Sequence, residues 1–261
     1  MTTLTTRDHH IQTERGKIFA RRWLYASDVS QDRAPILLFH ESLGCIDLWR
    51  GFPEKLALTT GRPVIAYDRL GFGRSDPYPG ELDVHFVSEE AETIVPLLRD
   101  QLEIARFVVC GHSVGGGMAI ATAARFPNDC TALVTMGAQA FAERHTLDGI
   151  RLARAEYAKP ENLARLKKYH GDKAKWVVDA WIETWLDPAF ADWNLDDAIA
   201  RVRCPVLAVH GGQDEYGSTE HPRRIADGRG TVEILPGVGH VPYRENEQAV
   251  LALIGQFLSG I

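Results

Sequence analysis

The sequence has few of the features that mark membrane-bound, secreted or nucleic-acid-binding proteins. Its apolar runs are only as long as strands, so no spanning helix is predicted, and residues 1–10 contain no apolar core of a secretory signal. Lysine and arginine number 29 against 35 acidic residues, which gives a formal net charge of −6. Because phosphate binding needs clustered basic side chains, we expect no nucleic-acid partner and no membrane association.

Cysteine is also scarce. The chain has four, Cys45, Cys110, Cys130 and Cys204, and they lie far apart with no Cys-x-x-Cys pair and no Cys/His spacing of a metal site. Two of them adjoin apolar runs that resemble buried strands. The pattern favours reduced thiols in a cytoplasmic protein over disulfides, and it predicts no metal site.

Short apolar runs alternate with longer helical segments through most of the 261 residues. Eight strands are predicted, at 9–13, 17–25, 36–39, 64–67, 107–110, 132–135, 206–209 and 232–235. Helices are predicted at 48–58, 88–102, 114–125 and 245–258. The first two strands read as an antiparallel hairpin, and the later alternation favours a mostly parallel sheet with helices on both faces.

One long stretch interrupts this alternation. Residues 139–195 contain no strand pattern, and four of the six tryptophans lie there: Trp176, Trp181, Trp185 and Trp193. We expect a core domain of residues 1–138 and 196–261 and a helical cap insertion of residues 139–195. Its aromatic rings either roof a pocket or simply pack the insertion onto the core, and both roles can hold for different rings.

The most informative motif is Gly-His-Ser-Val-Gly at 111–115, which fits Gly-x-Ser-x-Gly. A predicted strand precedes it and an alanine-rich helix follows it, which is the setting of a nucleophile elbow. In such a turn the side chain of Ser113 stands above the sheet edge, and glycines at 111 and 115 avoid collisions. The alternative is a glycine-rich turn kept for packing only.

A nucleophilic serine needs a histidine base and an acid that orients the base. For this turn the order along the chain is serine, acid, histidine. His240 lies in a Gly/Pro-rich loop after the last predicted strand, and Asp214 follows the strand at 206–209. We therefore expect Asp214 as the acid, with its neighbour Glu215 as the second choice.

Five segments together resemble the α/β-hydrolase fold superfamily, in its serine esterase-like branch with a helical cap. They are the His40 loop, YDRLGFGRSD at 67–76, GHSVGGG at 111–117, HGGQD at 210–214 and GVGHVPYREN at 237–246. The resemblance implies an eight-stranded α/β-hydrolase fold with Ser113, Asp214 and His240 as catalytic residues. It also implies that the reaction needs no cofactor.

The oxyanion hole of this family uses two backbone amides. The first is that of Val114, and the resemblance implies Ser42 for the second, with Leu43 next in line. Relatives usually have His-Gly where this chain has His40-Glu41. We interpret Glu41 as a structural brace of the donor loop whose carboxylate accepts loop amides or pairs with Arg69 or Arg74. We expect Leu43, Trp181 and Trp185 to contact the substrate.

The predicted function is hydrolysis of a small carboxylic ester through an acyl-enzyme intermediate. Hydrolysis of a carbon–carbon bond, lactone or thioester, and perhydrolysis, use the same triad and stay open. A different class, a non-catalytic receptor for a small ligand, also occurs on this fold. We expect a small-molecule substrate and a monomer or homodimer.

Overall fold

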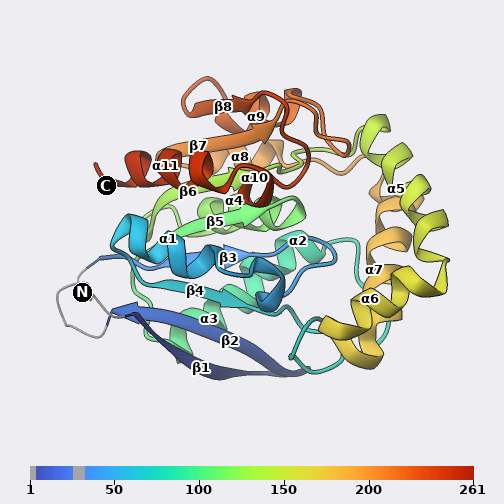
Figure 1. Ribbon diagram of the computed structural model, residues 1–261. Helices are drawn as coiled ribbons and strands as arrows, with labels where there is room; N and C mark the ends of the chain where they lie inside the picture. The colour runs from blue at the N-terminus through green and yellow to red at the C-terminus, as the bar shows by residue number, and fades with distance from the viewer. Residues whose placement is uncertain (1–3, 26–32) are drawn as a thin grey trace.

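The computed structural model describes residues 4–25 and 33–261 and contains one eight-stranded sheet (Figure 1). The strands are β1 (Leu4–Thr13), β2 (Gly16–Tyr25), β3 (Ile36–Phe39), β4 (Val64–Tyr67), β5 (Phe107–His112), β6 (Cys130–Met136), β7 (Val206–Gly211) and β8 (Thr231–Leu235). They lie in the order β1-β2-β4-β3-β5-β6-β7-β8. The β1–β2 and β2–β4 pairs are antiparallel and the remaining pairs are parallel. The predicted α/β-hydrolase sheet is confirmed.

Helices cover both faces of the sheet. One face carries α1 (Phe52–Thr60), α10 (Pro242–Glu245) and α11 (Glu247–Leu258). The other carries α2 (Phe86–Glu89), α3 (Val95–Gln101), α4 (Val114–Arg125), α8 (Asp196–Arg201) and α9 (Glu220–Ala226). Strand β3 shows why both layers are needed: Leu37 and Phe39 enter one core, whereas Ile36 and Leu38 enter the other. Side chains alternate along a strand, so an entirely apolar strand must be covered twice.

The stretch between β6 and β7 is mostly helical. It contains α5 (Arg144–Tyr157), α6 (Pro160–His170) and α7 (Ala174–Leu186), which lie together on the right of Figure 1, away from both chain ends. A bridge between Phe141 and Asn194 brings the two ends of this helical insertion together. Within residues 4–25 and 33–261, no helix is long and apolar enough to cross a bilayer.

Three predicted helices are interrupted in the structure. The segment 48–58 is a 3₁₀ turn at 46–49 followed by α1, which has a proline in its first turn. The segment 88–102 contains a π-helical turn at 90–94, because Pro96 has no N–H to bond regularly to the preceding turn. The segment 245–258 restarts at Asn246, whose side chain caps α11 by accepting the Ala249 N–H.

The cysteine prediction agrees with the structure. All four cysteines carry free thiols, and three of them are buried. The closest pair, Cys130 and Cys204, has its sulfur atoms 3.7 Å apart, well beyond the roughly 2 Å of a disulfide bond.

Candidate active site

Ser113 occupies a strained turn between β5 and α4. Its backbone has φ 54° and ψ −129°, a conformation that residues with a side chain rarely adopt. The turn is tight enough that a Cβ atom added to Gly111 would lie 2.1 Å from the Gly115 carbonyl oxygen. Both glycines are therefore needed, and the turn presents Ser113 at the carboxyl end of the central strand.

His240 links Ser113 to Asp214. Its Nε2 atom lies 3.0 Å from Ser113 Oγ, and its Nδ1 atom lies 2.9 Å from each carboxylate oxygen of Asp214. The three side chains follow β5, β7 and β8, which lie in the same half of the sheet, in the order β5-β6-β7-β8. The arrangement gives a hydroxyl, a base that can accept its proton, and an acid that fixes the tautomer of the base.

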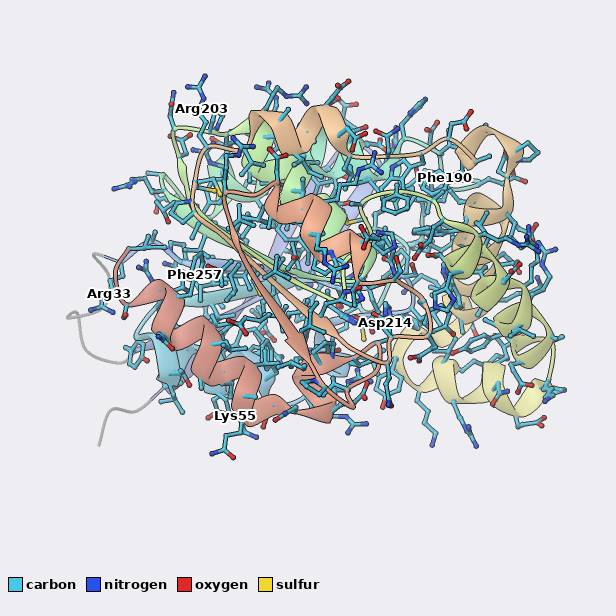
Figure 2. The ribbon with its side chains drawn as sticks, turned by 90° about the horizontal axis from the view of Figure 1, so that it is seen from above. Arg33, Lys55, Phe190, Arg203, Asp214 and Phe257 are labelled. Atoms are coloured by element: carbon cyan, nitrogen blue, oxygen red, sulfur yellow. The ribbon has the colours of Figure 1, made fainter. Side chains whose placement is uncertain are left out.

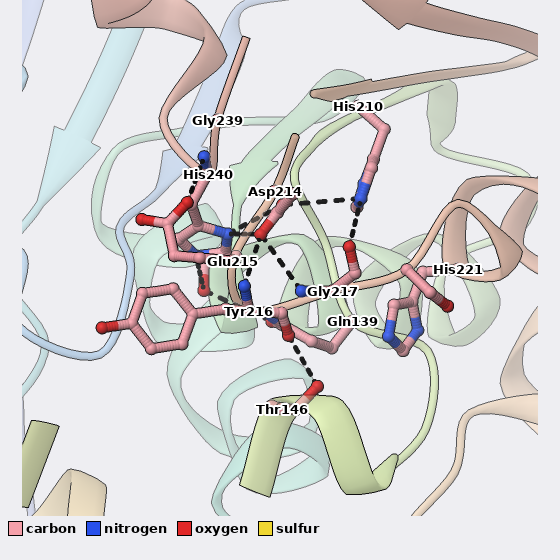
Figure 3. A network of polar contacts seen from close by, with 12 residues as sticks. Gln139, Thr146, His210, Asp214, Glu215, Tyr216, Gly217, His221, Gly239 and His240 are labelled. Atoms are coloured by element: carbon pink, nitrogen blue, oxygen red, sulfur yellow. Dashed lines mark hydrogen bonds and ion pairs between the residues drawn. The ribbon is translucent and has the colours of Figure 1, made fainter. Parts of the chain in front are cut away.

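Asp214 is held by its own loop (Figure 3). The N–H groups of Tyr216 and Gly217 donate to Asp214 Oδ1 over 2.8 and 3.1 Å. Burial raises the pKa of this carboxyl, but the hydrogen bond and charge of His240 and the Tyr216 N–H outweigh burial and lower it overall. Asp214 is therefore an ionised acceptor near neutral pH. Seen from above, it lies toward the helical insertion, far from Arg33 and Phe257 (Figure 2).

Glu215, the second choice for the acid, has a different contact. Its Oε2 atom accepts the backbone N–H of His240 over 3.2 Å, and the imidazole ring of His240 faces Asp214 instead. Glu215 thus holds the loop that carries His240, while Asp214 contacts the ring.

A cavity of about 320 Å³ opens beside Ser113 and His240. The core contributes Ser42 and Leu43 to its wall, and the insertion contributes Trp181 and Trp185. Its other lining residues are Glu41, Leu48, His112, Gln139, Thr146, Ile150, Tyr157, Leu166, Tyr216, Val241 and Arg244. The structure thus brings together the predicted serine, histidine, loop and tryptophan residues around one space.

The four tryptophans of the insertion divide into two groups. Trp181 and Trp185 are four residues apart on α7, so they share the helix face that lines the cavity. Trp176 instead packs against Tyr78, with ring centroids 5.3 Å apart, and Trp193 stacks on Phe190 at 5.1 Å. One pair of rings therefore faces the cavity, and the other pair packs the insertion onto its surroundings.

Val114 is buried and is the first residue of α4. Its amide follows Ser113 directly, at the N-terminal end of a twelve-residue helix where negative charge is favoured. Ser42 lines the same cavity as Ser113, in the turn closed by the bond from the Gly44 N–H to the Glu41 carbonyl. Val114 thus follows the serine in the chain, and Ser42 lies in the wall of the cavity beside it.

The insertion is fastened to the core on both sides of the cavity. At the end of α6, buried His170 accepts the Gly73 N–H and donates to the Leu43 carbonyl, each over 3.0 Å. Before α5, Glu143 accepts the N–H of Ser218 over 2.7 Å and contacts His221 at 2.8 Å. The insertion thus contacts the Leu43 loop and the loop that carries Asp214.

The predicted arginine partners of Glu41 are wrong. Arg74 pairs with Asp47 at 2.7 Å, and Arg69 donates to the backbone carbonyl of Glu41, not to its carboxylate. The carboxylate instead lies 3.4 Å from His112 Nδ1. Burial raises the pKa of Glu41, but the hydrogen bond with His112 and the charge on that ring outweigh burial, which leaves the pKa at about 2.

Sequence reasoning did not identify three polar residues at this site. His112 precedes the serine within the motif itself, and Gln139 follows β6 with its amide oxygen 3.3 Å from Ser113 Oγ. The Tyr216 ring packs at a tilt of 60° against the ring of His240, with centroids 5.0 Å apart. A useful signal was the order of the strands, because residues that follow neighbouring parallel strands meet at the same edge.

Comparison with known proteins agrees with this architecture. A family model described as the alpha/beta hydrolase fold matches residues 34–171, more than half of the chain. The 2-hydroxymuconate semialdehyde hydrolase of Pseudomonas sp. (strain CF600) is 26% identical over 258 residues, which cover 86% of this chain and 87% of the relative. The crystal structure of the enol-lactonase from Burkholderia xenovorans LB400 superposes with a TM-score of 0.72 at 20% identity, covering 96% and 100% of the two chains.

A further relative shares only part of its length. The mouse (Mus musculus) 1-acylglycerol-3-phosphate O-acyltransferase ABHD5 is 30% identical over 125 residues, which are 48% of this chain and 34% of the relative. The chain thus matches about a third of that protein. Taken with the family model, these similarities show that the chain belongs to the alpha/beta hydrolase fold family, which includes hydrolases.

Proposed function

We propose that the chain is a serine hydrolase that cleaves a small carboxylic ester. The observation that carries this proposal is the continuous contact from Ser113 through His240 to Asp214 beside a cavity of about 320 Å³. That volume lies at the small end of the range for ligand pockets, which favours a short acyl group. Hydrolysis of a lactone, a thioester or a carbon–carbon bond, and perhydrolysis, use the same triad and stay alternatives; a relative at 26% identity is a 2-hydroxymuconate semialdehyde hydrolase.

In the proposed mechanism, His240 acts first as a base and then as an acid. His240 Nε2 accepts the proton of Ser113 Oγ while the oxygen attacks the acyl carbonyl, and the amides of Val114 and Ser42 stabilise the oxyanion. His240 then gives the proton to the departing alcohol, which leaves an acyl-serine. A water deprotonated by His240 attacks this ester and releases the acid and the free serine.

We predict that a fluorophosphonate probe labels Ser113 in the folded protein. The reason is that the probe phosphorylates a serine only when a base activates the hydroxyl. Mass spectrometry of the labelled peptide checks the site, and Ser113→Ala should show no labelling and at least a thousandfold lower esterase activity, an order-of-magnitude expectation. An unlabelled Ser113 in folded protein would rule out the hydrolase and favour the receptor alternative.

We predict that p-nitrophenyl acetate and butyrate are hydrolysed at least about tenfold faster than the laurate ester, because Trp181 and Trp185 limit the length of the cavity. Trp181→Ala should shift the preference toward longer chains. Trp176→Ala is the matched control, since this tryptophan lies on the same helix but packs against Tyr78. Equal shifts in both variants, or no hydrolysis of short esters, would contradict the assigned pocket.

A further inference from the structure

His112 differs from the other buried histidines in what its two ring nitrogens face. Its Nδ1 atom lies 3.4 Å from a carboxylate oxygen of Glu41, and its Nε2 atom lies 2.8 Å from the backbone carbonyl oxygen of His240. Both neighbours are hydrogen-bond acceptors. A neutral imidazole has one N–H donor and one bare nitrogen, so it can satisfy only one of them.

Other histidines in the described part of the chain provide a comparison. Three of them accept a backbone N–H at one nitrogen and direct the other toward an oxygen, which suits a neutral ring: His40, His170 and His221. Because the ring of His112 is 1% exposed, water does not substitute for a missing donor. A ring that carries two N–H groups can donate to both the Glu41 carboxylate and the His240 carbonyl oxygen.

The alternative is a protonated Glu41 that donates to a bare Nδ1 atom. Burial alone raises the pKa of Glu41, and the hydrogen bond and charge of His112 bring it down to about 2, so an ionised Glu41 and a charged His112 belong together. The carboxylate packs closely against Gly44, because a Cβ atom at that position would lie 2.7 Å from Glu41 Oε2. The acid therefore lies beneath its own turn.

We infer that buried His112 and partly exposed Glu41 form an imidazolium–carboxylate pair that positions His240 through its backbone carbonyl and opposes premature protonation of the His240 ring. This inference rests on the proposed function, since it assigns the pair a task in activating Ser113. A negative charge next to Ser42 would weaken the binding of an oxyanion at the Ser42 amide, and the imidazolium of His112 neutralises that charge.

The electrostatic effect follows from the order of the groups. The rings of His112 and His240 have centroids 5.0 Å apart, whereas Glu41 contacts the far nitrogen of His112. The positive charge is thus nearer to His240 than the negative one. A second positive charge next to His112 is therefore unfavourable in the resting enzyme, whereas the oxyanion that forms when His240 takes the proton of Ser113 offsets it.

Two other groups adjoin this array. Tyr243 of α10 packs against the His112 ring at 5.1 Å, and burial raises its pKa well above the usual value, so its phenol is neutral. Arg244 lines the same cavity, but its guanidinium donates to the Leu48 carbonyl.

Two carboxylates hold the backbone around His240: Glu215 accepts its N–H over 3.2 Å, and Glu245 accepts the N–H groups of Gly239 and Val241 over 2.7 and 2.9 Å. The charged groups that face the rings are therefore Asp214 and Glu41.

The Glu41→Gln variant removes the negative charge of the side chain and keeps its size and shape. A glutamine has the same size and can donate from its amide to a bare Nδ1 atom, so His112 can keep its bond to the His240 carbonyl as a neutral ring. The variant should therefore retain the loop and lose only the charges. Glu215→Gln is the matched control, because it also neutralises a carboxylate that contacts the His240 backbone, at 3.2 Å.

The first measurement is NMR of protein with ¹⁵N-labelled histidine, with the His112 signals assigned by their loss in His112→Asn. At about pH 8, we expect two protonated ring nitrogens for His112 in the wild type and in Glu215→Gln, and one in Glu41→Gln. A neutral His112 in the wild type, or an unchanged imidazolium in Glu41→Gln, would overturn the inference. This readout does not need an active serine, so it stands even when the hydrolase proposal fails.

The second measurement is the rate of fluorophosphonate labelling of Ser113 against pH. At about pH 8, Glu41→Gln and the wild type should agree within about threefold. At about pH 6 the variant should be slower by about three- to tenfold, because the positive charge of His112 beside His240 is absent. A merely structural role would slow labelling equally at both values and would overturn the electrostatic part of the inference.

Discussion

Asp214→Asn is expected to lower kcat by about a thousand- to ten-thousandfold while the protein stays folded. The asparagine oxygen can still accept the N–H groups of Tyr216 and Gly217, which now donate to Asp214 Oδ1. Its NH₂ group then faces His240 Nδ1 and requires a bare nitrogen there. The proton moves to Nε2, which can no longer accept a proton from Ser113.

The measurement is kcat on a short p-nitrophenyl ester, with the thermal unfolding midpoint as the check on folding. Glu215→Gln is again the control. We expect it to lower kcat by less than about tenfold, since Glu215 contacts the backbone N–H of His240 and not its ring. An Asp214→Asn enzyme within tenfold of the wild type would show that the ring of His240 is oriented by something else.

The sequence predicts Asp214 as the acid, but it does not predict that Glu215 contacts the backbone of His240. Asp214 was assigned by chain order and by its place after the strand at 206–209, which are properties of the sequence alone. The contact of Glu215 with His240 joins residues 25 apart through the shape of two loops. Only the folded backbone fixes that geometry.

Most of the sheet was predictable for a similar reason. The strands at 36–39 and 64–67 have the predicted bounds, because a continuous apolar run between turn residues is a local signal. Helix α4 also has the predicted bounds. The interruptions at Pro96 and Asn246 were missed because a helical period continues across them, and the break depends on single backbone hydrogen bonds.

The partner of Glu41 needed the strand order. His112 is 71 residues away in the sequence, yet β3 pairs with β5 and Phe39 lies opposite Gly111. The residues that leave these two strands therefore emerge side by side. Sequence reasoning looked for an arginine to neutralise Glu41, because arginine is the usual partner of a carboxylate, and it overlooked a histidine inside the serine motif.

The second large effect is expected for Gly115→Ala, which should lower the free energy of unfolding by at least about 3 kcal/mol. A Cβ atom at this position would lie 2.2 Å from the carbonyl oxygen of Phe39 and 2.6 Å from that of His40. Both obstacles are backbone atoms at the end of β3, so no side-chain rotation relieves the clash. Helix α4 would have to move away from β3.

Gly117→Ala is the matched control in the same helix. Its added Cβ atom would meet the end of the Leu195 side chain at 3.3 Å, which a small shift can accommodate. Alanine also favours a helix over glycine by roughly 1 kcal/mol, so this variant should be as stable as the wild type or slightly more stable. Thermal unfolding should separate the two variants by roughly 6–12 °C or more.

The same pair of variants tests how the site depends on the fold. Ser113 is two residues before Gly115, and the close approach of α4 to β3 brings the serine next to Ser42 and Glu41. Gly115→Ala should therefore also lose labelling of Ser113 at temperatures where it remains folded, whereas Gly117→Ala should label at the wild-type rate. A Gly115→Ala protein with wild-type stability and labelling would mean that the turn can relax, and that the packing of glycine against β3 does not position the serine.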